Sequence, residues 1–418
     1  MEWTPEIQQF ITNHLADDTA RLLFSAHRYP GIDMTFAVEQ IEARRRLRNK
    51  LPEWYADPDL IMGGKIPAEQ CSSETTARFK RTIMLPDARS LCDMTGGMGV
   101  DCWYMSRQLD YAIYTERLPH LCEAARHNFA VLSAKDLGQP TRIEVREGLS
   151  TELPIPDVDV IYLDPARRST DGSRIFEISD CEPDVVAWQD NLLAHCRQLI
   201  TKVSPMADIS RTVARLRHVS GVHVLSVKGE CKELLVTQCP EASSSAHIGD
   251  YPIHCLDFYP DRTIEFHFVH QDDELSAPKL HVSRIATSLG DWFYEPDVSI
   301  MKAQGFDALL AAYPVQMLDA DCHYFTSSAL IPDFPGRIFA IDEQLKFASS
   351  NLKALRAHVP QANIAVRNFP LTADALRNRT GIRDGGDVYL FGATVSTVGP
   401  VLIRCHKFNN LRNENSSL

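Results

Sequence analysis

From Ser90 onward, short apolar runs alternate with longer segments in which apolar residues recur every three or four positions. Short apolar runs are typical of buried strands, and the longer spacing is typical of helices that pack on a sheet. The expected strands, in chain order, are SLCDM, YAIYTE, RIEVRE, DVIYLDP, QLITKV, HVLSV and ELLVTQ, and helical segments separate most of them. This alternation predicts an α/β domain with helices on both faces of a largely parallel sheet.

Two regions with other patterns flank the α/β domain. Residues 1 to about 58 read as helical, and the segments from RIFAID to PVLIRCHKF predict a small ferredoxin-like unit in the order β-α-β-α-β-β. YPIHCLDFYPDRTIEFHFV predicts a hairpin, and the small, polar stretch Cys239–Gly249 is the best linker candidate. The expected domain limits are 1–88 for the N-terminal helical region, 89–240 for the α/β domain, 241–330 for a ferredoxin-like connecting region and 331–418 for the C-terminal domain.

The composition limits which cellular compartment and which partners we expect for the protein. The chain has 418 residues, 11 scattered cysteines without a C-x-x-C pair, and no apolar run long enough to span a membrane. Its first residues show neither the basic nor the apolar region of a signal peptide. We therefore expect a cytoplasmic protein with buried free thiols, no metal site and no membrane partner. The formal net charge of −12 argues against a nonspecific nucleic-acid coat.

Two basic clusters are nevertheless candidates for nucleic-acid contacts. The first lies in the N-terminal helical region, where a solvated helix face is the favoured interpretation: Arg44, Arg45, Arg46, Arg48 and Lys50. The second lies in ALRNRTGIRDGG and on the strand before it: Arg377, Arg379, Arg383, Arg367, Asn363, Asn368 and Phe369. Basic side chains near an aromatic ring suit RNA backbone contacts and base stacking. A solvated basic helix explains the second cluster equally well.

The stretch LCDMTGGMGVD joins the first strand of the sheet to its helix and places an acid before a glycine-rich bend. Glycines at that junction let a ligand approach the backbone closely. Both dinucleotides and S-adenosylmethionine bind at such bends. The spacing departs from the dinucleotide pattern, because Cys102 stands where a glycine or alanine is expected. Asp93, before the bend, would repel a pyrophosphate but suits the ammonium group of S-adenosylmethionine.

Acids at the ends of two later strands extend this candidate site. Glu116 closes the second strand and can accept hydrogen bonds from ribose hydroxyls in either cofactor class. Asp164 and Pro165 follow the fourth strand, at the edge where open α/β sheets bind ligands. Asp164 can accept the hydrogen of a target nitrogen there and orient its lone pair. The fifth strand ends in LITKVSPMADIS without a cysteine, which disfavours covalent methylation at pyrimidine C5, although Cys181 is not excluded as a nucleophile.

At these positions the sequence resembles class I S-adenosylmethionine-dependent methyltransferases. D-M-T-G-G-M-G is similar to their motif I, with Thr95 in place of the first glycine, Glu116 is similar to the acidic motif II, and D-P-A-R is similar to motif IV. More narrowly, the chain resembles the bacterial methyltransferase-like family with a THUMP-like C-terminal domain. The shared segments cover most of the chain: EQCSSETTARFK, LDPARRS, GECKELLV, FYEPDVSIMKA, FPGRIF, ANIAVRNFPL and GGDVYLF.

The resemblance implies a Rossmann-like class I methyltransferase sheet with an N-terminal helical segment and a C-terminal α+β ferredoxin/THUMP-like domain. It implies S-adenosyl-L-methionine as the cofactor and RNA (tRNA or rRNA) as the partner, with no DNA expected. It assigns cofactor binding to Asp93, Thr95, Gly96, Gly97, Gly99, Glu116, Leu149 and Asp164. It assigns the target site to Asp164, Pro165, Ala166 and Arg167. One departure is that Gly148 and Leu149 stand where many class I enzymes have an acid.

Several alternatives stay open at this point. EQCSSETTARFK, just before the sheet, is either a helix cap or a lid over the site. The expected methyl acceptor is a base nitrogen in structured RNA, and the alternative acceptor is a protein or a small molecule. A non-catalytic RNA-binding protein with a relic cofactor pocket is a further alternative, and a dinucleotide-dependent oxidoreductase is a more distant one.

Overall fold

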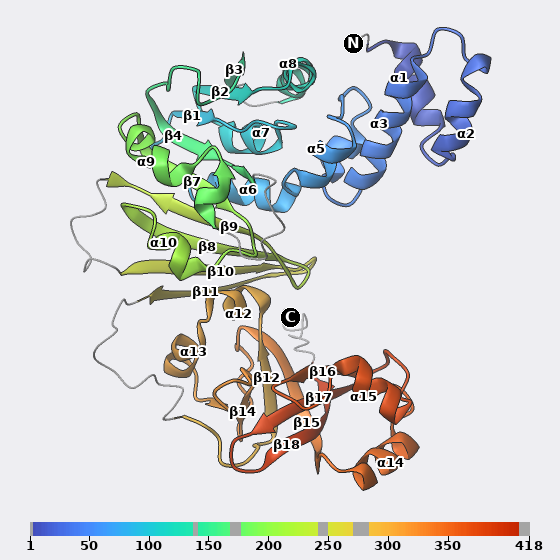
Figure 1. Ribbon diagram of the computed structural model, residues 1–418, viewed down its shortest axis with the longest axis vertical. Helices are drawn as coiled ribbons and strands as arrows, with labels where there is room; N and C mark the ends of the chain where they lie inside the picture. The colour runs from blue at the N-terminus through green and yellow to red at the C-terminus, as the bar shows by residue number, and fades with distance from the viewer. Residues whose placement is uncertain (1–2, 137–140, 168–176, 241–249, 271–283, 409–418) are drawn as a thin grey trace, which may run out of the picture. The chain divides into compact units, whose positions relative to one another are not determined.

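The computed structural model describes residues 3–136, 141–167, 177–240, 250–270 and 284–408 (Figure 1). The chain divides into two compact units. The first unit comprises Met1–Val222 and Glu233–Ala246, and the second comprises His223–Lys232 and His247–Leu418. Of the linker candidate Cys239–Gly249, residues 241–249 lie outside the described part of the chain, and the four expected domain limits stay predictions.

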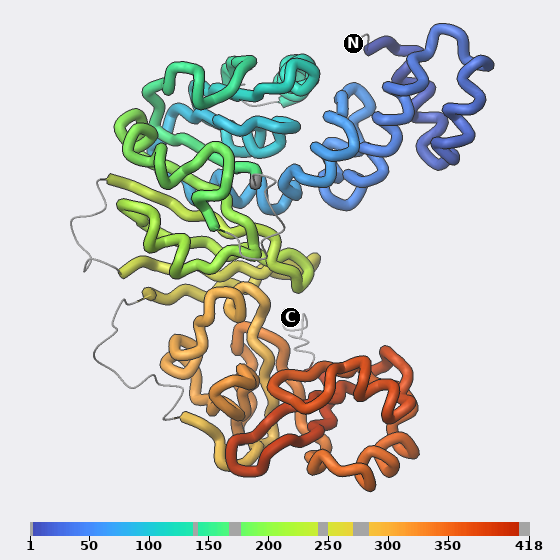
Figure 2. Tube along the Cα trace, in the orientation of Figure 1, coloured from blue at the N-terminus to red at the C-terminus, as the bar shows by residue number. Residues whose placement is uncertain are grey.

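The first unit begins with short helices, drawn in blue in Figure 2. They are α1 (Pro5–Asn13), α2 (Thr19–Phe24), the 3-10 helix η1 (Ala26–Arg28), α3 (Met34–Leu47), α4 (Pro52–Ala56), α5 (Lys65–Gln70) and α6 (Glu74–Thr82). Several begin at a side chain that accepts a hydrogen bond from a backbone N–H of the first turn, as expected for N-caps: Thr4, Asp18, Asp33 and Ser73. Ile7, Phe10 and Ile41 pack in a shared apolar core.

Two members of the basic cluster of this region, Arg44 and Arg46, make contacts within the first unit. Arg44 is only 3% exposed, and its guanidinium donates hydrogen bonds to the carbonyl oxygens of Asp57 and Leu60. Arg46 forms an ion pair with Glu69, with 2.7 Å between Nε and Oε1. The expectation of a solvated helix face is therefore wrong for Arg44, because its donors satisfy backbone carbonyls that would otherwise be buried without partners.

A sheet of mainly parallel strands forms the centre of the first unit. Its strands are β1 (Ser90–Asp93), β2 (Tyr111–Glu116), β3 (Arg142–Glu147), β4 (Val158–Leu163), β7 (Cys196–Val203), and the parts of β8 (Val219–Val227) and β9 (Glu230–Gln238) that belong to this unit. They lie in the order β8-β9-β7-β4-β1-β2-β3, with β9 antiparallel to β7. The connections contain α7 (Val100–Ser106), α8 (Pro119–Lys135), β5 (Ala166–Arg167), the 3-10 helix η2 (Ile178–Asp180), β6 (Cys181–Glu182), α9 (Val185–Leu193) and α10 (Ile209–Val213).

The order of the strands reverses at β1. The chain proceeds from β1 outward to β2 and β3, and then returns to β4 on the other side of β1. Asp93 is consequently paired with Tyr114 of β2 and with Tyr162 of β4. Open α/β sheets bind ligands outside the carboxyl ends of the strands at this switch point. The fold therefore places the ends of β1 and β4 at the expected ligand edge (Figure 1), with Asp93 ending β1 and Asp164 following β4.

The second unit contains the expected hairpin, formed by β10 (Tyr251–Phe258) and β11 (Thr263–His270), and a seven-stranded sheet in the order β13-β14-β12-β15-β18-β17-β16. The β-α-β-α-β-β prediction is confirmed by β15 (Gly336–Lys346), α14 (Ser349–His358), β16 (Asn363–Arg367), α15 (Ala373–Thr380), β17 (Val388–Val395) and β18 (Gly399–Lys407). Before these elements come β12 (Trp292–Pro296), α12 (Val298–Ala303), α13 (Phe306–Ala312), β13 (Gln316–Met317) and β14 (Phe325–Ser327). None of the helices in the described part of the chain has the length and apolar character needed to cross a bilayer.

Candidate active site

Hydrogen bonds to the neighbouring strand β2 fix the glycine-rich bend after β1. The Gly96 amide donates to the carbonyl oxygen of Thr115 at 2.8 Å, and the Gly97 amide donates to Glu116 Oε2 at 2.9 Å. The Tyr114 hydroxyl donates to the carbonyl oxygen of Gly97 at 2.6 Å. These bonds fix the bend before any ligand arrives, so its backbone is preorganised.

The glycines of the bend serve different purposes. A Cβ at Gly96 would lie 2.2 Å from Cε2 of Tyr114, and a Cβ at Gly99 would lie 2.8 Å from Cζ of Phe129. Both residues therefore make room for aromatic rings of the protein, and their contact with a cofactor stays a prediction. Gly97 has φ of +54°, which favours glycine, and a Cβ there would meet nothing closer than 3.9 Å. Only Gly97 leaves an open side.

Asp93 is the buried acid at the end of β1. Its side chain is 1% exposed, and Oδ1 accepts a hydrogen bond from the Thr95 amide at 3.0 Å. Oδ2 is buried and has no hydrogen-bond partner among the described residues. Burial raises the pKa of Asp93 well above its ordinary value. A buried carboxylate oxygen without a donor is costly, so this position fits a cationic ligand group.

Glu116 occupies the end of β2, beside the bend. Its Oε2 accepts from Gly97 and its Oε1 accepts from the Leu118 amide at 2.9 Å. A carboxylate oxygen has a further lone pair, so Glu116 can still accept from ribose hydroxyls. The Gly148 amide donates to the Glu116 carbonyl oxygen at 2.9 Å, which places partly buried Leu149 just beyond the neighbouring strand end. The structure thus brings the predicted cofactor residues of three strand ends to one edge.

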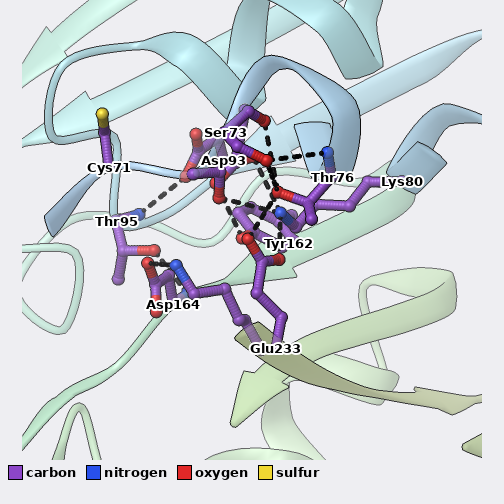
Figure 3. A network of polar contacts seen from close by, with 12 residues as sticks. Cys71, Ser73, Thr76, Lys80, Asp93, Thr95, Tyr162, Asp164 and Glu233 are labelled. Carbon is purple, nitrogen blue, oxygen red and sulfur yellow. Dashed lines mark hydrogen bonds and ion pairs between the residues drawn. The ribbon is translucent and has the colours of Figure 1, made fainter. Parts of the chain in front are cut away.

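Thr95 links the end of β1 to the end of β4. Its hydroxyl oxygen accepts a hydrogen bond from the Asp164 amide at 2.6 Å, which gives this departure from the glycine of motif I a structural reason (Figure 3). Lys202 Nζ lies 2.5 Å from Asp164 Oδ2. The sequence analysis missed Lys202, although its place at the carboxyl end of β7, two residues before Ser204-Pro205, was the available signal.

The remaining predicted target residues follow Asp164 directly. Pro165 is partly buried, Ala166 is exposed, and the backbone of β5 pairs with β6 through Arg167 and Cys181. The side chain of Arg167 lies outside the described part, so its role as a phosphate clamp stays a prediction. Cys181 is 1% exposed, and this burial argues against its use as a nucleophile.

A buried network of charged side chains joins α6, α7 and β9 beside this site (Figure 3). The Lys80 side chain is fully buried, and Nζ lies 2.8 Å from Ser72 Oγ, 3.0 Å from Asp101 Oδ1 and 2.5 Å from Glu233 Oε2. Burial raises the pKa values of Asp101 and Glu233, but Lys80 and then Lys202 outweigh burial, and the net shift is downward for both. Both carboxylates are therefore ionised at neutral pH.

The segment EQCSSETTARFK supplies one side of this network. Ser73 caps α6 by accepting a hydrogen bond from the Thr76 amide at 3.2 Å, which confirms the helix-cap interpretation. The Thr76 hydroxyl donates to Glu233 Oε1 at 2.6 Å, and the Tyr162 hydroxyl donates to Asp101 Oδ2 at 2.9 Å. Segments separated widely in the sequence therefore meet in one polar cluster, and the alternative interpretation of a lid stays untested.

Two members of the second basic cluster, Arg367 and Arg377, form ion pairs within the second unit. Arg367 Nη2 lies 3.0 Å from Glu295 Oε1, and its guanidinium lies 4.7 Å from the ring centre of Tyr324. Arg377 pairs with Asp384, with 2.5 Å between Nη2 and Oδ1. Arg367 and Arg377 are thus engaged within the second unit, and the expectation that they face RNA is not supported by their contacts.

Comparisons with known proteins agree with this architecture. Residues 292–335 match a ferredoxin-like domain family, and residues 336–407 match a THUMP domain-like family. A structurally characterised candidate methyltransferase from Porphyromonas gingivalis W83 is 31% identical, covers 98% of this chain and 100% of its own, and has a TM-score of 0.85. A candidate methyltransferase from Pseudomonas syringae is 18% identical over 40% of this chain and 97% of its own, with a TM-score of 0.28. No curated protein matches the chain.

The similarity to the Porphyromonas gingivalis protein extends over both units and exceeds the level at which only a shared fold follows. This one chain contains both a sheet whose strand order reverses at β1 and the ferredoxin-like and THUMP-like regions. The chain belongs to the bacterial family of class I methyltransferase-fold proteins that carry a THUMP-like C-terminal domain.

Proposed function

We propose that this protein is an S-adenosylmethionine-dependent methyltransferase that acts on a base nitrogen of structured RNA. The observation that carries the proposal is the buried Oδ2 of Asp93, which has no donor among the described residues and lies at the switch point of the sheet. An ammonium group of the cofactor would supply the donor that this oxygen lacks. The proposed cofactor residues are Asp93, Thr95, Gly96, Gly97, Gly99, Glu116, Leu149 and Asp164.

The charges around the site support a cationic cofactor. In the described part of the chain, four acids surround two lysines: Asp93, Asp101, Asp164 and Glu233 around Lys80 and Lys202. S-adenosylmethionine supplies a methyl group on a positively charged sulfur and carries an ammonium group, so it complements this excess of carboxylates. A pyrophosphate would add negative charge to the same region, which disfavours a dinucleotide.

Asp164 is the proposed acceptor for the hydrogen of the target nitrogen. Its side chain is 34% exposed, and only Oδ2 is engaged, by Lys202. The amide hydrogen bond to Thr95 fixes its backbone beside the cofactor bend. In the transfer, the nitrogen lone pair forms the N–C bond, the S–C bond breaks with its electron pair left on sulfur, and the displaced hydrogen leaves as a proton through Asp164 to water. Positioning of this kind contributes up to roughly 7–11 kcal/mol in ideal cases.

The second unit offers a surface that supports RNA as the substrate. Its helices α14 and α15 pack together through Leu355 and Leu376. They and the loop after α15 expose cations that form no ion pair among the described residues: Lys353, Arg356, Arg379 and Arg383. Arg379 also lies 5.9 Å from the ring centre of Phe347. Phosphate contacts need such uncompensated cations, and the THUMP-like match of this region points to the same partner.

The deciding experiment transfers a tritiated methyl group from S-adenosylmethionine to total RNA of a deletion strain, followed by mass analysis of the nucleosides. We expect label in tRNA or rRNA at a base nitrogen. Asp164→Ala should abolish transfer while the cofactor Kd stays within tenfold, and Asp157→Asn, on an 89% exposed side chain before β4, should leave transfer unchanged. Label in protein or small molecules alone would refute the RNA substrate, and absence of cofactor binding by the folded protein would refute the enzyme.

A further inference from the structure

Lys202 is a charged residue that the strand register places at the target edge of the site. β7 runs parallel to β4, and Leu163 is paired with Thr201, so the next residues along the two strands are Asp164 and Lys202. Their side chains approach to 2.5 Å between Oδ2 and Nζ. The Lys202 side chain is 14% exposed, against 34% for Asp164. The ammonium group therefore lies on the protein side of the pair, and the carboxylate lies on the open side.

The surroundings of the pair keep the ammonium charged. Burial lowers the pKa of Lys202, but the carboxylates of Asp164, Glu233 and Asp101 outweigh burial and the net shift is upward. The titratable groups near Asp164 are Lys202 on β7, Asp101 on α7, Glu233 on β9, Asp93 at the end of β1 and Tyr162 on β4. Burial raises the pKa of Asp164, and Lys202 is the cation among these groups that opposes this rise, so Asp164 depends on it for charge compensation.

We propose that Lys202 is the positioning residue that keeps the Asp164 carboxylate negatively charged and leaves its second oxygen free for the target nitrogen. Lys202 occupies Oδ2, and no described residue donates to Oδ1. The proposal rests on the proposed function, because it names what prepares Asp164 for the transfer. Lys202 acts through Asp164 and does not touch the transferred methyl group.

A charged Asp164 also restricts the atom that can be methylated. An ionised carboxylate accepts hydrogen bonds and donates none. Its partner must therefore be a nitrogen that bears a hydrogen before the transfer, such as an exocyclic amino group or the N1–H of guanine. Nitrogens that carry only a lone pair, such as adenine N1 or guanine N7, would face the carboxylate with like electron density. The substrate class is thus an N–H of an RNA base.

The direct test measures the titration of Asp164 without any substrate. Full-length protein labelled with [13C]aspartate gives a carboxyl signal for Asp164, identified by its loss in Asp164→Asn. Removal of a cation at this distance raises the pKa of a carboxyl group by roughly 1–3. We expect Asp164 to titrate at correspondingly higher pH in Lys202→Met than in the wild type, and Lys202→Arg to titrate like the wild type. Equal titration in the wild type and Lys202→Met would overturn the inference.

Methyl transfer gives the second readout. In Lys202→Met, we expect kcat at pH 7 to fall at least tenfold and to recover as the pH rises, with the RNA KM and the cofactor Kd within threefold. A merely structural defect would lower kcat by the same factor at every pH. Lys202→Arg should retain the wild-type pH profile, and Lys232→Met, on a 42% exposed side chain of β9, should retain full activity.

The outcomes separate this inference from the proposed function. If the wild type transfers no methyl group to RNA but Asp164 titrates as expected, the proposed function fails and the charge coupling stands. If RNA is methylated at a nitrogen without a hydrogen, the proposed function stands, and the inference that the Lys202–Asp164 pair orients an N–H of the target base is refuted. A pH-independent loss in Lys202→Met also contradicts the role given to Lys202.

Discussion

Replacing Lys80 by methionine is the most severe test of the buried network. The lysine is shielded from solvent, so water cannot take the place of its ammonium group. Its side chain is fully buried and lies within ion-pair distance of Asp101 and Glu233. Methionine fills a similar volume without a charge. Lys80→Met therefore leaves two buried carboxylates that keep their hydroxyl donors but lose their nearest cation, while the surrounding packing changes little.

The expected loss follows from the burial of these groups. Removing one partner of a buried ion pair costs about 3–5 kcal/mol, because the other charge stays buried without compensation. Lys202 still lies near both carboxylates, so we expect the lower end, about 3 kcal/mol. With an m-value of about 3 kcal/mol/M, typical of larger domains, the urea midpoint falls by roughly 1 M.

The pH dependence has a definite sign. In the wild type the folded-state pKa values of Asp101 and Glu233 lie below their unfolded values, so the stability they contribute is present above about pH 4 and is lost as the pH falls through the folded pKa values. Without Lys80, burial dominates and the folded pKa values rise. The gap in stability between Lys80→Met and the wild type is then widest near neutral pH and narrows as the pH falls toward about 5.

Urea unfolding followed by tryptophan fluorescence measures this loss. Four of the five tryptophans lie in the first unit: Trp3, Trp54, Trp103 and Trp188. Lys135→Met is the matched control, since that lysine also pairs with two carboxylates but is 48% exposed, and it should cost at most about 1 kcal/mol. The double variant Lys80→Met/Glu233→Gln should recover part of the loss. A loss under about 1 kcal/mol, or strictly additive losses in the double variant, would refute the reasoning.

Two further predictions test the cofactor and RNA sites. Asp93→Asn should raise the cofactor Kd at least tenfold in calorimetry, and wild-type affinity should weaken as the pH falls, because the raised pKa of Asp93 lets the carboxylate protonate above its ordinary range; equal, pH-independent affinities would contradict this. Arg356→Ala combined with Arg379→Ala should reduce the slope of log K against log salt for RNA binding by roughly 1–2, since each phosphate contact contributes about 0.7–0.9. Arg367→Ala should destabilise the second unit and leave that slope unchanged, and a reduced slope in this variant would reverse our assignment of the cations.

The order of elements was accessible from the sequence because it depends on local periodicity. Apolar runs such as SLCDM and DVIYLDP gave strands, and the acids after them were correctly placed at one edge, since parallel strands end on the same side. The pairing of Asp93 with both neighbouring strands follows from that topology. What the pattern cannot contain is the burial of a particular side chain, and Arg44 shows this, because a basic helix residue reads as solvated until its carbonyl partners are known.

The individual reasons for the glycines were also hidden in the sequence. A glycine with an open side and a glycine that faces Tyr114 look the same in a motif, and only the distance from a hypothetical Cβ to that ring separates Gly96 from Gly97. Thr95 is the opposite case, because a departure from the glycine pattern proved to be a link, through its hydroxyl, to Asp164. The Thr95 hydroxyl accepts a hydrogen bond that a glycine, which has no side chain, cannot accept.

The network around Lys80 explains why several distant segments belong to one site. Lys80 comes from EQCSSETTARFK, Asp101 follows the glycine bend, Tyr162 belongs to the strand before Asp164, and Glu233 lies in GECKELLV. Removing one partner of a buried ion pair is costly, so the loss of one segment leaves charges in the others with less compensation. This mutual dependence ties the helix before the sheet and the antiparallel strand β9 to the switch point. The charge balance of the proposed methyl-transfer site therefore depends on residues that need never touch the cofactor.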